Sequence, residues 1–88
     1  MSLSELREQI DKIDEQIVDL FIERMKVSGE IAKVKQADGK AVFDPQREKE
    51  KLAEIGRLAG GEWQADAEKL YSLLMELSRT YQARLGAK

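Results

Sequence analysis

Apolar residues recur every three or four positions along the first part of the chain and form an unbroken helical stripe. The stripe, called the seam here, alternates steps of three and four residues without a slip, as does one face of a helix that packs lengthwise against another helix. Nine of its ten positions are apolar, and Arg24 is the exception. The seam consists of Leu3, Leu6, Ile10, Ile13, Ile17, Leu20, Arg24, Val27, Ile31 and Val34.

Polar residues at both ends of the seam predict the limits of the first helix. Ser2 and Glu5 have the spacing of a capping box, in which a cap residue is followed three positions later by Glu. The segment Ala37-Asp38-Gly39 ends the helix, because Gly readily takes the left-handed conformation found after a helix. The predicted helix therefore has more than about 30 residues and a length of roughly 50 Å.

Two further helices follow. Asp44-Pro45 predicts the start of the second, with a capping side chain and then Pro at the first helical position, and Gly60-Gly61 ends it. The short connection at 38–43 must reverse the chain. The third helix is expected to start between Trp63 and Asp66 and to end near Leu85. Its predicted buried side consists of Ala67, Leu70, Tyr71, Leu74, Leu77, Tyr81 and Leu85.

The composition supports an all-α fold and restricts the chemistry. With six Gly, one Pro and 6% aromatic residues, the 88-residue chain is rich in strong helix formers, which argues against disorder, collagen or a β-sandwich. It has neither Cys nor His, which excludes thiolate nucleophiles, disulfides, the usual Cys/His zinc sites and imidazole acid–base catalysis. We expect one helical domain over residues 1–88 that uses no metal and no cofactor.

The charge balance indicates local anion binding only. Fifteen basic and 17 acidic residues give a formal charge of −2, which provides no general attraction to nucleic acid or anionic membranes. The chain shows neither a signal peptide nor the ~20 apolar residues of a membrane span. We therefore predict a cytoplasmic protein that binds neither nucleic acid nor membrane.

The length of the first helix predicts an assembly. A compact chain of 88 residues has a radius of gyration near 12 Å and spans roughly 30 Å. A helix of roughly 50 Å with a continuous seam cannot be covered by so small a chain. We expect a homodimer built on this helix.

Each predicted helix also carries a polar residue on its apolar side. Arg24 interrupts the seam, Glu48 lies on the same side of the second helix as Ile55, and Ser78 and Gln82 lie on the inner side of the third. A buried charge needs a partner or a ligand. Singly, each has a structural explanation, such as setting coiled-coil register for Arg24 or a favourable helix dipole for Glu48. Together they predict a polar pocket between helices.

Cations near these residues suggest an anionic ligand. Arg24 and Lys35 lie about 20° apart around the first helix and roughly 16 Å apart along it, so both side chains can reach one small anion between them. Arg47 stands beside Glu48 in the first turn of the second helix. Arg7 lies roughly 25 Å from Arg24, and only a symmetric partner chain can bring it to the same pocket. On spacing alone, Arg7 is better explained as a solvated residue that pairs with an acidic neighbour.

Four segments resemble the all-helical (AroQ-type) chorismate mutase family. They are LREQIDKID at 6–14, Glu23-Arg24, IAKVK at 31–35 and VFDPQRE at 42–48, with a looser match through Ser78 and Gln82. The resemblance implies an intertwined dimer of three-helix chains that converts chorismate to prephenate in the biosynthesis of Phe and Tyr. This rearrangement needs no proton transfer and no covalent intermediate, which suits a chain without His and Cys.

The resemblance also implies how a dicarboxylate substrate would be bound. Arg24 and the partner chain's Arg7 would hold its two carboxylates, with Arg47 nearby and Ser78 in contact with one carboxylate. Guanidinium groups suit this role because they bind both oxygens of a carboxylate at once.

The remaining positions of the family pattern imply the catalytic contacts. Lys35 would donate to the ether oxygen and to a carboxylate, and Gln82 would be the second donor at the ether oxygen. Glu48 would accept the substrate hydroxyl, with Asp44 next to it at the helix start. Every position is occupied by a compatible residue.

Three other functions stay open at this point. Isochorismate pyruvate lyases share the fold and the cationic clamp. A regulatory domain cut from a larger aromatic-pathway enzyme would bind chorismate without converting it. A plain coiled-coil interaction module would explain the regular heptads of the first helix.

Overall fold

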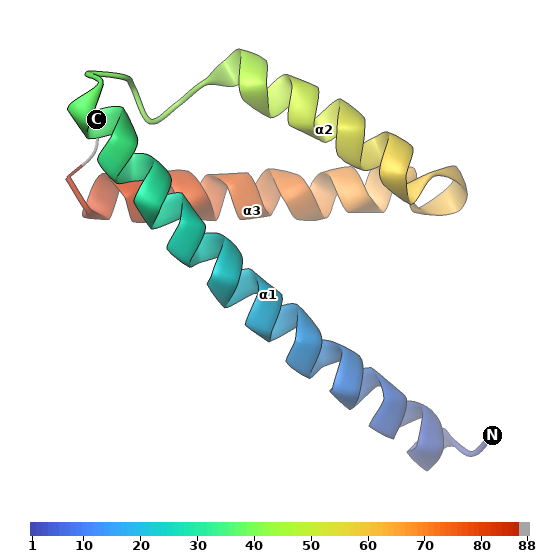
Figure 1. The fold of residues 1–88 in the computed structure, drawn as a ribbon. Helices are drawn as coiled ribbons and strands as arrows, with labels where there is room; N and C mark the ends of the chain where they lie inside the picture. Colours follow the sequence, from blue (N-terminus) through green and yellow to red (C-terminus); the bar gives the residue numbers. More distant parts are fainter. Residues whose placement is uncertain (87–88) are drawn as a thin grey trace.

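The computed structural model describes residues 1–86 of the chain, which leaves the last two residues of the predicted 1–88 domain outside it. The described residues form three α-helices and no strand (Figure 1). Helix α1 spans Leu3–Ala37, α2 spans Pro45–Ala59 and α3 spans Gln64–Arg84, with a short 3₁₀ turn, η1, at Gly61–Trp63. The predicted all-α class and the three-helix order are confirmed.

The helix ends follow the predicted caps. The Ser2 hydroxyl accepts a hydrogen bond from Glu5 N at 3.1 Å, and the Glu5 side chain accepts one from Ser2 N, so the capping box is complete. At the other end of α1, Gly39 takes a left-handed φ of 69°, which lets Lys40 N donate to Lys35 O at 2.8 Å. Local sequence therefore sets both ends of the long helix.

Helices α2 and α3 lie side by side in opposite directions, and α1 crosses α3 only with its carboxyl half (Figure 1). Helices α1 and α3 come close together at Gly29, where an added Cβ would lie 3.2 Å from Tyr81 Cε2. Ala32 is fully buried in this contact, while Ile55 and Met75 are buried where α2 meets α3. The core of the chain is therefore small and lies at one end of α1.

The amino half of α1 projects away from the other two helices (Figure 1). Every residue from 1 to 20 is exposed, and the radius of gyration is 16.0 Å, against about 12 Å for a compact chain of this length. The nine apolar seam residues remain between 44% and 62% exposed. The chain thus leaves its most regular apolar face uncovered.

The predicted buried side of α3 was wrong at three positions. Leu70, Leu77 and Leu85 are exposed in the chain, whereas Met75, outside the predicted set, is 7% exposed. The reason is that α1 meets α3 over one half only, so α3 buries a narrower strip than its apolar pattern offers. No helix among residues 1–86 is both long enough and apolar enough to cross a membrane.

Candidate active site

One cavity of about 370 Å³ lies where the carboxyl half of α1 faces the amino end of α2 and the carboxyl half of α3. This volume is in the range of sites for small organic ligands. All three helices and the connection before α2 contribute to its wall. The lining residues are Arg24, Val27, Ser28, Ile31, Lys35, Val42, Asp44, Arg47, Glu48, Lys51, Met75, Ser78, Arg79 and Gln82.

The cavity is cationic although the chain as a whole is slightly acidic. Five of the lining side chains are Lys or Arg and two are carboxylates. A concave site with an excess of one charge concentrates its field between walls of low dielectric constant. The cavity is therefore suited to a small organic anion.

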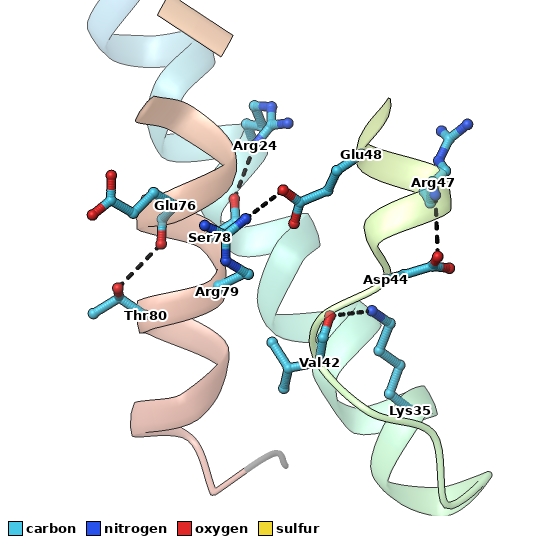
Figure 2. A network of polar contacts seen from close by, with 10 residues as sticks. All are labelled: Arg24, Lys35, Val42, Asp44, Arg47, Glu48, Glu76, Ser78, Arg79 and Thr80. Carbon is cyan, nitrogen blue, oxygen red and sulfur yellow. Dashed lines mark hydrogen bonds and ion pairs between the residues drawn. The ribbon is translucent and has the colours of Figure 1, made fainter. Parts of the chain in front are cut away.

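Arg24 reaches from α1 across to α3. Its Nη1 donates a hydrogen bond to Ser78 Oγ at 2.8 Å (Figure 2). Its guanidinium carbon also lies 5.6 Å from the centre of the Tyr71 ring. The aromatic face and the hydroxyl hold the side chain in one place but use only part of its five donors. Arg24, the one cation of the seam, therefore faces α3 at the cavity, and several of its donors remain available for a ligand.

Lys35 connects the end of α1 to the segment that leads into α2. Its Nζ donates to Val42 O at 2.7 Å, and two residues later the Asp44 carboxylate accepts from Arg47 N at 3.1 Å as the cap of α2 (Figure 2). The ammonium group has three donors, so this contact leaves two of them available. Lys35 can thus hold the connection and still bind an anion.

Glu48 lies on the cavity side of α2, half-buried, and forms an ion pair with Arg79 of α3 (Figure 2). Arg79 in turn lies over the Phe43 ring, with 5.0 Å between the guanidinium carbon and the ring centre. The requirement that an inward carboxylate have a partner is met by a cation from another helix. The sequence had pointed to Arg47 as the cation nearest to Glu48.

Gln82 is buried in the cavity wall and has an unpaired atom. Its Nε2 donates to Ser28 Oγ at 2.9 Å, and among residues 1–86 its Oε1 has no hydrogen-bond partner although the side chain is buried. The Ser28 hydroxyl can donate as well as accept, so a half-turn of the amide keeps this contact and places an N–H donor where the oxygen now lies. An unsatisfied buried amide is costly, and a ligand is one way to satisfy it.

Seven of the eight predicted site residues line this one cavity, and Arg7 does not. Arg7 lies in the exposed amino half of α1, roughly 25 Å along the helix from Arg24. Figure 2 shows the Arg47 guanidinium directed away from the Asp44 carboxylate, so Arg47 lies at the rim. The seven that come together are Arg24, Lys35, Asp44, Arg47, Glu48, Ser78 and Gln82.

Sequence reasoning missed three polar residues of the wall, Arg79, Ser28 and Lys51. Arg79 follows the predicted Ser78 directly, and the need of Glu48 for a partner could have led to it. Ser28 lies four residues after Arg24, on the same side of α1. Lys51 lies one turn after Arg47 and pairs with Glu54 at 3.5 Å, so its spacing alone looks like an ordinary surface ion pair.

The fold and the cavity together define an all-helical protein with a cationic site for a small anion. Within residues 1–86, no three potential ligand side chains lie close enough together to hold a metal ion. The chain belongs to the chorismate mutase type II family, whose sequence model matches residues 6–83. The resemblance noted in the sequence is thereby confirmed over nearly the whole chain.

Three relatives illustrate how the family uses this unit. The chain is 32% identical to a chorismate mutase of Methanocaldococcus jannaschii over 83 residues, 91% of this chain and 83% of that protein. It is 41% identical to a bifunctional chorismate mutase/prephenate dehydratase of Aquifex aeolicus over 64% of this chain, and 34% identical to the T-protein of Haemophilus influenzae over 53%. These matches span only 16% and 12% of the latter two proteins. No solved structure matches the chain significantly.

Proposed function

We propose that this chain is a chorismate mutase that converts chorismate to prephenate, a step toward Phe and Tyr. One C–O bond breaks and one C–C bond forms within the same molecule, so no proton and no second reactant are needed. The observation that carries the proposal is the convergence of Arg24, Lys35 and Gln82 on one cavity that also contains Glu48. The proposed unit covers residues 1–88, uses no cofactor and acts in the cytoplasm.

The cations of the cavity would hold the substrate in its reactive shape. Chorismate has two carboxylates, and the rearrangement requires its side chain to fold over the ring. Arg24 would bind one carboxylate with the donors that Ser78 leaves free, and Ser78 would add its hydroxyl. Arg47 at the rim would add positive charge. Holding two reacting carbons of one molecule together lowers the barrier by removing unproductive conformers.

Lys35 and Gln82 would stabilise the charge that develops during the reaction. Negative charge grows on the ether oxygen as its bond to the ring breaks. Lys35 has two donors beyond its contact with Val42 O, and the amide of Gln82 has an unused polar position in the buried wall. One fixed donor of this kind in a dry site contributes about 3 kcal/mol to the transition state.

Glu48 would recognise the ring hydroxyl of chorismate. A carboxylate accepts hydrogen bonds, and Glu48 is the half-buried carboxylate of the cavity. Asp44 lies nearby, but its carboxylate already accepts Arg47 N as the helix cap, so its contribution is to place the start of α2. Glu48 would therefore select a substrate that has a hydroxyl on its ring.

A second copy of the chain would complete the site as an intertwined homodimer. The apolar seam residues are about half exposed, and burying them fully is worth on the order of 1 kcal/mol each. Val27 and Ile31 lie at the open side of the cavity, where a partner helix would close it. In an antiparallel arrangement, the amino half of the partner's α1 would bring the partner subunit's Arg7 to the second carboxylate.

The direct test is the ultraviolet decay of chorismate with purified protein, combined with chromatographic identification of the product. The proposal expects prephenate at a rate far above the uncatalysed one. If isochorismate is supplied as a second substrate and salicylate is formed, the protein would instead be identified as a lyase. Tight binding of chorismate without turnover would identify a regulatory domain, and either result would overturn the proposal.

Complementation tests the shared site. Arg7→Ala and Arg24→Ala should each be nearly inactive, because each removes one carboxylate contact from both sites of a dimer. Random exchange of the two variants gives half heterodimers with one intact site each, so about a quarter of the wild-type activity should return. If subunits exchange without any recovery, Arg7 does not act across the interface.

A further inference from the structure

Arg79 is a cation of the cavity wall to which neither the sequence nor the proposed mechanism gives a role. It lies on α3 between Ser78 and Gln82, and its guanidinium pairs with Glu48 Oε1 and lies over the Phe43 ring. The three residues come from α3, α2 and the connection before α2. The Arg79 side chain thus joins three elements at one corner of the cavity, and Figure 2 shows its contact with Glu48.

The charge of Glu48 creates a problem that Arg79 can solve. A dianionic substrate is repelled by a carboxylate in the same cavity, and the repulsion grows as water is excluded. The Glu48 side chain is 23% exposed, so solvent screens it only in part. An ion pair with Arg79 offsets this charge while the carboxylate remains an acceptor.

The geometry leaves Glu48 able to bind a hydroxyl. The ion pair uses Oε1, and among the described residues no hydrogen bond to Oε2 is present. A guanidinium on one oxygen restrains the rotation of the carboxylate and so fixes the direction of the other oxygen. The Phe43 ring restrains Arg79 at the wall through a cation–π contact. Arg79 is therefore placed to act on Glu48 rather than on the substrate.

We propose that Arg79 is a positioning residue that holds Glu48 as an oriented, charge-compensated acceptor for the ring hydroxyl of the substrate. The proposal rests on the mutase function and on the role of Glu48 given above. It deepens that function by assigning the selectivity for a hydroxyl-bearing substrate to a pair of residues. It also makes the contribution of Arg79 depend on the presence of the Glu48 carboxylate.

The test is a double-mutant cycle on kcat/KM for chorismate. Arg79→Met retains the length and the apolar contact with Phe43 but removes the charge, and we expect a loss of about tenfold, most of it in KM. In the Glu48→Gln background the same substitution should change kcat/KM less than about twofold. Arg79→Lys should recover part of the loss, because it restores the charge without the guanidinium fork.

A second readout uses a chorismate derivative whose ring hydroxyl is methylated and can no longer donate. Arg79→Met should lower kcat/KM for chorismate and leave the value for the methyl ether nearly unchanged. Arg84→Met is the matched control, since Arg84 is also an arginine of α3 that lies over an aromatic ring, Tyr81 at 5.6 Å, but it does not line the cavity. This control should leave both substrates unaffected.

The outcomes separate the two proposals. If the wild-type protein does not convert chorismate, the proposed function fails, and the role of Arg79 fails with it. If the wild type is active but the losses of Arg79→Met and Glu48→Gln multiply, Arg79 acts on the substrate directly and the positioning role is wrong. Thermal unfolding shows whether Arg79→Met is folded, and if it is not, the same cycle with Arg79→Lys decides.

Discussion

The two halves of α1 carry the same apolar repeat in different surroundings. From Leu3 to Leu20 every residue is exposed to solvent, and within residues 1–86 neither α2 nor α3 covers this half of the helix. From residue 21 onward, α3 packs against a neighbouring face through Gly29 and Ala32, and the seam borders the cavity at Arg24, Val27 and Ile31. One continuous stripe therefore lies in two different surroundings.

The difference shows that the residues beside the apolar stripe of a helix determine whether another helix of the chain can pack closely against it. The carboxyl half has small residues at 28, 29 and 32, which let α3 approach closely and which are all buried. The amino half has longer, mostly charged residues beside its seam, so nothing in the chain can approach it in the same way. The seam of the amino half is then available to a second copy.

The largest expected effect comes from a charge in the amino half of the seam. Ile13→Glu would bury two unpaired carboxylates in each proposed dimer, at a cost of at least about 4 kcal/mol, which weakens association roughly 1000-fold. Sedimentation should show monomers at micromolar concentration, with mutase activity lost because Arg7 no longer reaches the site. Gln16→Glu adds the same charge beside the seam and should remain dimeric. A dimeric, active Ile13→Glu protein would contradict the use of the seam.

A smaller but still large effect is expected at the polar position of the carboxyl half. Arg24→Leu restores an apolar seam and removes one cation of the site, so kcat/KM should fall about 100-fold, the equivalent of ~3 kcal/mol, without a fall in melting temperature. Arg57→Leu, on an exposed part of α2 away from the cavity, is the control. Full mutase activity in Arg24→Leu would contradict the role of Arg24 in binding a substrate carboxylate.

The smallest expected effect concerns the contact that only the carboxyl half makes. Gly29→Leu pushes a side chain toward Tyr81 and Leu85, which lie 3.2 and 3.4 Å from the position of an added Cβ. We expect the free energy of unfolding to fall by about 2 kcal/mol in urea denaturation. Glu30→Leu, at a position 72% exposed, should change it little. Equal effects of the two substitutions would contradict the close packing at Gly29.

The positions of the helices follow from local sequence, and the cap residues account for this. Ser2 with Glu5, and Asp44 with Pro45, satisfy the first N–H groups of their helices with atoms a few residues away. Such interactions need no tertiary contact, so a pattern of residues predicts them. The buried side of α3 was predicted less well. Both Leu77 and Met75 are apolar, and the position of the neighbouring helices determines that Met75 rather than Leu77 is buried.

The residues of the candidate site likewise divide into those that the sequence identified and those that only the tertiary structure revealed. Arg24, Glu48 and Gln82 were identified because each interrupts an apolar stripe, which is a property of one helix at a time. Arg79 was missed because its importance comes from Glu48, a residue of another helix, and its own spacing resembles that of a solvated arginine. Sequence can indicate that a buried charge needs a partner but not which one.

By itself, the sequence determined the three helices, their ends and the polar residues on their inner faces, because helix formation and capping are interactions over three or four residues. The tertiary structure decided which face of α1 meets α3, which cation pairs with Glu48 and which part of the seam is left uncovered within residues 1–86. These outcomes depend on how closely side chains from distant segments can approach, as Gly29 against Tyr81 shows. No periodicity within one helix contains that information.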